Sequence, residues 1–68
     1  MPKFYVNKNR QRKGEHEVHQ TGCKHMPEPE NRKYLGVFAS CRGAMVAAKN
    51  EYDNVDGCFY CCKNCHTK

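Results

Sequence analysis

The sequence has few of the residues that usually build a hydrophobic core. It has no tryptophan and no isoleucine, and Leu35 is its only leucine. Hydrophobic residues make up 38% of the 68 residues, and a chain of this size buries only about 60% of its unfolded surface on folding. We therefore expect residues 1–68 to form one small domain that needs a metal ion or cross-links for stability.

Long apolar runs are also missing. The first 14 residues carry five basic side chains and no apolar stretch, whereas a secretory leader has an apolar segment behind its basic residues. No segment approaches the roughly 20 apolar residues that a membrane span requires. These absences predict a cytoplasmic protein without a membrane partner. In that compartment disulfides are rare.

Recognisable catalytic patterns are absent as well. The sequence has no glycine-rich phosphate loop and no Ser-His-acid arrangement. His16 and His19 flank Glu17, but they are three residues apart, whereas the zincin pattern needs two histidines four residues apart on one helix. We therefore expect a protein that is not an enzyme.

Cysteine, in contrast, is abundant. Four of the six cysteines fall within the ten residues 57–66. Thiols this dense on a short chain indicate a metal site, a set of disulfides or redox chemistry. A reducing compartment favours the metal, and a structural Zn²⁺ can contribute roughly 10 kcal/mol or more to folding.

The spacing of the ligands predicts a zinc site. Such sites take four Cys or His ligands, in pairs separated by two to four residues, because one tight turn then presents both side chains to the same ion. Two pairs fit this rule: His19 with Cys23, and Cys58 with Cys61. Cys62 and Cys65 form an overlapping pair with the same spacing and remain an alternative for the second pair.

Periodicity and turn residues predict a small α+β fold. We expect an N-terminal β-hairpin (residues 4–6 and 15–19), a rigid Pro-containing connector at 26–31, a third strand at 34–38, a helix at about 40–52, a turn at 53–57 and a cysteine-rich C-terminal knuckle. Gly36 within the third strand indicates a bulge or a close backbone approach. Ser40 is a good N-cap for the helix. Cys41, on the apolar face of that helix, is expected to be a small buried hydrophobic residue.

The positive charge is concentrated near the N-terminus. The net charge is +5, and the hairpin loop carries four basic residues before the first acidic one: Lys8, Arg10, Arg12 and Lys13. A loop of this charge can contact phosphate groups. More often, a run of this kind is a solvated turn or a frayed end without a ligand.

The order of these motifs resembles the Ada-type metal-binding fold. In that family a pair of ligands separated by three residues precedes a strand, a helix and a terminal CxxC, which here correspond to His19–Cys23, residues 34–38, residues 40–52 and Cys58–Cys61. The Cys65-His66-Thr67 ending is also similar to a small bacterial family with a cysteine-rich tail. The resemblance implies a bound zinc ion. It does not imply methyl transfer, because the position of the methyl-accepting cysteine is taken by His19.

Three functional classes remain open. The first is a monomeric domain with structural zinc that binds a protein or a nucleic acid. The second is a thiol-reactive or redox protein that uses Cys61, Cys62 or Cys65 as a thiolate. The third is a small domain stapled by disulfides. The first class is favoured, because the two ligand pairs have the spacing of a zinc site.

Overall fold

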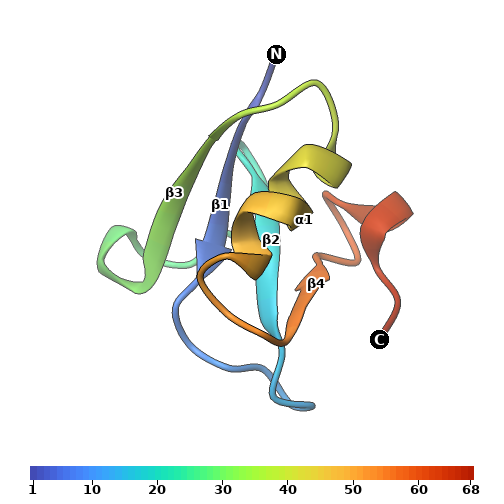
Figure 1. Ribbon diagram of the computed structural model, residues 1–68. Coiled ribbons are helices and arrows are strands. Elements are labelled where there is room, and N and C mark those ends of the chain that lie inside the picture. Colours follow the sequence, from blue (N-terminus) through green and yellow to red (C-terminus); the bar gives the residue numbers. More distant parts are fainter.

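The computed structural model, which describes all 68 residues, contains a four-stranded mixed sheet with one α-helix packed on one of its faces (Figure 1). The sheet has the strand order β3-β1-β2-β4. The small α+β class predicted from the sequence is therefore confirmed. The elements are β1 (Lys3–Asn7), β2 (His16–Gln20), β3 (Arg32–Val37), α1 (Cys41–Lys49) and β4 (Val55–Gly57), with short 3₁₀ turns at Pro29–Asn31 and Lys63–Cys65.

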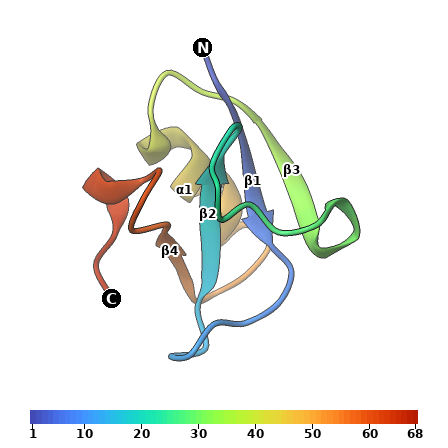
Figure 2. The same ribbon diagram turned by 180° about the vertical axis from the view of Figure 1, so that it is seen from behind.

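Strands β1 and β2 form the expected antiparallel hairpin. Val6 pairs with Val18, and Tyr5 pairs with His19. Because neighbouring residues of a strand point to opposite faces, the two valines face α1 and Tyr5 and His19 face away from it. The segment that joins β2 to β3 crosses this second face (Figure 2).

The third strand pairs with β1 in antiparallel fashion and contains the irregularity that Gly36 indicates. Phe4 pairs with Gly36 and Tyr5 with Tyr34, so Leu35 is the extra residue of a β-bulge. Gly36 has a φ of +131°, a conformation that only glycine adopts without strain.

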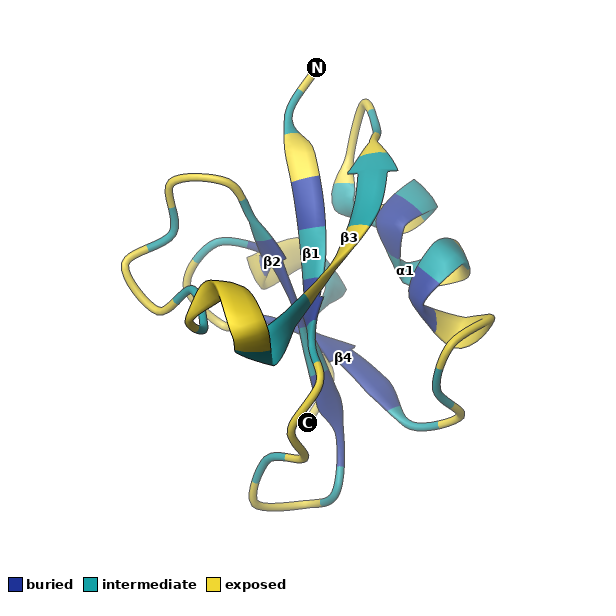
Figure 3. Cartoon of the chain, turned by 90° about the vertical axis from the view of Figure 1, so that its left-hand side faces the viewer, coloured by how far each residue is buried: buried dark blue, intermediate teal, exposed yellow.

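The core lies between the sheet and α1 (Figure 3). Its buried hydrophobic members are Phe4, Val6, Val18, Ala44, Ala48, Val55, Cys58 and Cys62. Two of these eight residues are cysteines, which take the place of the missing leucines and isoleucines. The helix has nine residues, and no helix of the protein is long and apolar enough to cross a membrane.

The helix is shorter than predicted. The hydroxyl of Ser40 accepts a hydrogen bond from the Arg42 N–H, as expected for an N-cap, but the helix ends at Lys49 rather than near Tyr52. The ring of Tyr52 stacks on His16 with 3.7 Å between ring centroids. Tyr52 thus leaves the helical path to pack against β2.

Two short elements replace predicted irregular structure. Residues 53–57 were expected to form only a turn, yet Val55–Gly57 is a strand parallel to β2. β2 supplies its hydrogen bonds, so three residues suffice without a strand pattern of their own. In the connector at 26–31, Pro29–Asn31 forms a 3₁₀ turn in which Pro29 occupies a first-turn position, where its missing N–H costs nothing.

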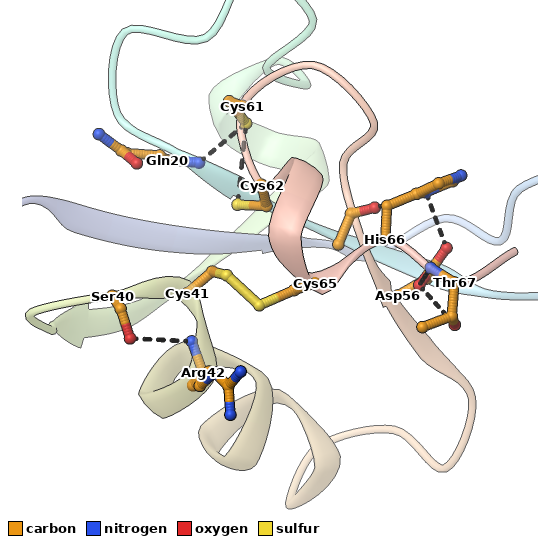
Figure 4. Close-up of a disulfide and its surroundings, with 11 residues drawn as sticks. Gln20, Ser40, Cys41, Arg42, Asp56, Cys61, Cys62, Cys65, His66 and Thr67 are labelled. Atoms are coloured by element: carbon orange, nitrogen blue, oxygen red, sulfur yellow. Dashed lines mark hydrogen bonds and ion pairs between the residues drawn. A yellow bond between two sulfur atoms is a disulfide. The ribbon is translucent and has the colours of Figure 1, made fainter.

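Cys41 has a different role from the one predicted. It forms a disulfide with Cys65, 24 residues further along the chain (Figure 4). Closing a loop of this length stabilises a protein by roughly 3 kcal/mol. The disulfide fastens the C-terminal 3₁₀ turn to the start of α1.

A buried carboxylate holds the last residues of the chain against β4. Asp56, which is 1% exposed, accepts hydrogen bonds from the N–H and hydroxyl of Thr67 and from the N–H of Lys68 (Figure 4). The His66 Nδ1 lies 3.0 Å from Oδ2 of Asp56, the oxygen that also accepts from the Lys68 N–H. Burial alone would raise the pKa of Asp56, but these donors hold it below its ordinary value of 3.8.

We predict that Asp56→Asn lowers the free energy of unfolding by about 1–3 kcal/mol at pH 7, because a buried acceptor that serves several donors is weakened. Denaturant titration in the presence of Zn²⁺ measures the loss. The exposed Asp53, changed to Asn, is the matched control and should have little effect.

The same interaction makes the free energy of unfolding depend on pH. Since the folded pKa of Asp56 lies below 3.8, the folded state binds fewer protons than the unfolded state, and the stabilisation is complete above about pH 3.8 and lost as the pH falls through the folded pKa. The difference between the wild type and Asp56→Asn should shrink there. Equal stability of the two proteins at pH 7 would contradict this account.

Candidate metal centre

Four potential metal ligands converge at the C-terminal end of β2. One ligand atom from each lies within 4.8 Å of all the others: His19, Cys23, Cys58 and Cys61. The Cys23 and Cys58 sulfurs are 3.9 Å apart, and the Cys61 sulfur is 3.9 Å from the His19 Nδ1. Zn–S bonds of about 2.3 Å in a tetrahedron separate two sulfurs by roughly 3.8 Å. The separation of the Cys23 and Cys58 sulfurs therefore fits a four-coordinate metal ion.

β2 and the turn after it position the first two ligands. His19 is 1% exposed and points away from α1, because its neighbour Val18 belongs to the core on the other face. The chain then turns at Gly22, which has a φ of +88°. The N–H of Cys23 donates to the Gln20 carbonyl at 3.1 Å. This turn returns Cys23 to the side of His19.

The cysteine-rich knuckle positions the other two ligands. The N–H of Cys58 donates to the Val18 carbonyl, which continues the β2–β4 ladder into the knuckle, and the N–H of Cys62 donates to the Cys58 carbonyl. A Cβ at Gly57 would lie 2.7 Å from the Cys62 carbonyl oxygen. Only glycine therefore allows the chain to fold back tightly enough for Cys58 and Cys61 to face one ion.

Backbone N–H groups point at the sulfurs. The Gln20 N–H donates to the Cys61 sulfur at 3.2 Å (Figure 4), and the His25 N–H donates to the Cys23 sulfur at 3.4 Å. Three thiolates around Zn²⁺ carry one net negative charge. Donors of this kind stabilise that charge in a buried site, so the surroundings suit thiolate ligands.

Burial sets the protonation of the cluster. It lowers the pKa of His19 to about 4, with a smaller contribution from His25, so the imidazole is neutral at pH 7 and free to coordinate. Burial also raises the pKa of the Cys58 and Cys61 thiols. These thiols must lose their protons when a metal binds, so metal binding releases protons.

The alternative second pair is not brought to the cluster as a pair. Cys65 is engaged in the disulfide with Cys41. Cys62 keeps a free thiol, 2% exposed, whose sulfur lies 3.9 Å from that of Cys61 (Figure 4). Cys62 is thus a spare thiol next to the four candidate ligands.

One side chain at the site was missed by the sequence reasoning. A carboxylate oxygen of Glu17 lies 3.6 Å from the Nε2 of His19, whereas the Cys61 sulfur lies near the other ring nitrogen, Nδ1. Burial, and then repulsion from Glu15, raises the pKa of Glu17. Carboxylates commonly orient the free nitrogen of a metal-bound histidine. The position of Glu17 two residues before His19 on a strand, and hence on the same face, was the available signal.

The basic residues of the hairpin loop do not belong to the metal cluster. Lys8, Arg10, Arg12 and Lys13 are all exposed on the loop between β1 and β2. The Lys13 ammonium group donates to the backbone oxygen of Lys68 at 3.2 Å. The other three have no hydrogen-bond partner for their charged groups within the protein.

The chain was compared with protein-family models, with curated proteins and with solved structures, and no match was found in any of the three comparisons. The structure itself supports a small cysteine-rich domain with a candidate metal site.

We predict that Cys58→Ser and Cys61→Ser each abolish stoichiometric Zn²⁺ binding, because three ligands with a weak hydroxyl do not hold a structural ion. Cys62→Ser is the control from the same knuckle and should keep one Zn²⁺ per chain while losing some stability. Metal content after dialysis measures both effects. If Cys61→Ser keeps its zinc and Cys62→Ser loses it, the fourth ligand is Cys62 instead of Cys61.

Proposed function

We propose that this protein is a structural zinc-binding mini-domain that serves as a binding module. The observation that carries the proposal is the convergence of one imidazole and three thiols within 4.8 Å. This donor set is typical of structural zinc sites, in which four protein ligands fill the tetrahedron. A filled tetrahedron leaves no position for a catalytic water, which supports a role other than that of an enzyme.

The partner is proposed from the charge. The net charge of +5 and the exposed cations of the hairpin loop favour an anionic partner, either a nucleic acid or an acidic protein surface. Lys8, Arg10, Arg12 and Lys13 would make the phosphate contacts. The proposed module is a monomer.

We also propose that the protein is related to the Ada-type metal-binding fold and that it comes from a bacterium. The ligands support it through their order along the chain: His19 on β2 and Cys23 just after it form the first pair, and the second pair follows the helix and β4. The proposed cytoplasmic location requires the Cys41–Cys65 disulfide to persist among reducing thiols, which is rare. Trapping of free thiols in intact cells would test that location.

A thiol-based redox role is the second candidate. It is favoured by the free thiol of Cys62, which lies beside Cys61 and three residues before the disulfide-bonded Cys65. Burial raises the pKa of the Cys62 thiol. A redox-active cysteine usually has a lowered pKa and good access to solvent, so the zinc role has the stronger support.

Native mass spectrometry with and without a chelator tests the proposed function. We predict one Zn²⁺ per chain at neutral pH, and unfolding on its removal, because metal binding and folding are coupled in domains this small. The disulfide should appear as a mass deficit of about 2 Da relative to the fully reduced chain. A protein that stays folded without bound metal would contradict the proposal and favour the redox or disulfide alternative.

A further inference from the structure

A cavity of about 290 Å³ lies beside the metal cluster. It shares His19 and Cys58 with the cluster, but its other lining residues are not candidate ligands. The β1–β2 loop contributes Asn7 and Gln11, and the knuckle contributes Phe59 and Tyr60. The volume lies just below the usual range for ligand pockets and has room for one small group.

Aromatic rings form one side of this cavity. Phe59 and Tyr60 are 49% and 68% exposed, and their rings meet edge to face with 5.2 Å between centroids. His25, which also lines the cavity, stacks on Tyr60 at 4.0 Å. Because Phe59 and Tyr60 lie between the ligands Cys58 and Cys61, the metal would hold both rings in place. Exposed rings on a rigid support are a stacking platform.

Basic residues adjoin the lining residues of this cavity along the chain. Lys8 and Arg10 are exposed on the loop segment between the lining residues Asn7 and Gln11. On the other side, the Lys63 ammonium group lies 5.8 Å from the centroid of the Phe59 ring. The complementary ligand has a flat ring and a negative charge next to it.

The remaining lining groups are polar. Asn7 and Gln11 carry amides, and Glu17 carries a carboxyl group. Amide and carboxyl groups recognise the donor and acceptor edges of nucleobases. A base can reach such a cavity only when it is unstacked, and unstacked bases are the usual targets of proteins that bind single strands.

We propose that this cavity receives one base of a single-stranded nucleic acid, stacked on the ring of Tyr60 with Phe59 beside it at right angles, and with the adjacent phosphates on the β1–β2 loop. The inference rests on the proposed role as a zinc-stabilised binding module and names its ligand class. An acidic peptide would satisfy the basic loop but would leave the rings and the amides without a partner.

The test uses the zinc-loaded full chain and a fluorescein-labelled single-stranded octanucleotide of mixed sequence, with fluorescence anisotropy as the readout. We expect Tyr60→Ala to weaken binding by roughly 5- to 150-fold, the loss that corresponds to removal of one base–aromatic stack. Tyr60→Phe keeps the ring and should restore binding. Tyr34→Ala is the matched control, because Tyr34 is 51% exposed on β3 and does not line the cavity.

Further arms separate base recognition from simple charge attraction. The duplex of the same sequence and a poly-glutamate peptide should bind more weakly than the single strand. Equal binding of either, or no effect of Tyr60→Ala, would overturn the proposal. Absence of any binding by protein that contains one Zn²⁺ and is folded would also overturn it, while leaving the structural role of zinc intact. The zinc content and the melting temperature of each variant show whether it is zinc-loaded and folded.

Discussion

The convergence of three thiols and one imidazole at the end of β2 is the constraint on which the rest of the structure depends. It joins the N-terminal hairpin, through His19 and Cys23, to the C-terminal knuckle, through Cys58 and Cys61. Between these pairs in the sequence lie β3, α1 and β4, so the cluster closes the part of the chain that contains them. A bound cation of charge +2 offsets the repulsion between three thiolates and the cost of burying them. Metal coordination would therefore do here what a large apolar core does in a longer chain.

The remaining supports act on the last third of the chain. The core contributes only one aromatic ring, and its other buried side chains are small. The Cys41–Cys65 disulfide and the Asp56 carboxylate each hold the C-terminal segment against the body of the protein. The aromatic rings of the knuckle, Phe59 and Tyr60, lie outside the core and are exposed. The candidate metal cluster, the cavity and the basic loop occupy one region of the molecule.

Much of the fold could be predicted from the sequence. The alternation in residues 4–6 and 15–19, the N-cap at Ser40 and the glycine at the bulge of β3 all act locally, so their effects can be read from neighbouring residues. β4 could not be predicted, because its three residues depend on hydrogen bonds from β2, far away in the chain. The same is true of Cys41: its spacing on the helix indicates burial, but its disulfide partner is set by the tertiary fold. Ligand spacing identified four residues that the fold brings together, yet it could not distinguish the pair Cys58 and Cys61 from the overlapping pair Cys62 and Cys65.

X-ray absorption at the zinc edge of the metal-loaded protein tests the central claim most directly, because it counts the atoms bound to the ion. The account predicts about three sulfurs at ~2.3 Å and one nitrogen at ~2.0–2.1 Å. A shell of four sulfurs would mean that Cys62 replaces His19. A shell of nitrogen and oxygen alone would contradict the proposed centre altogether.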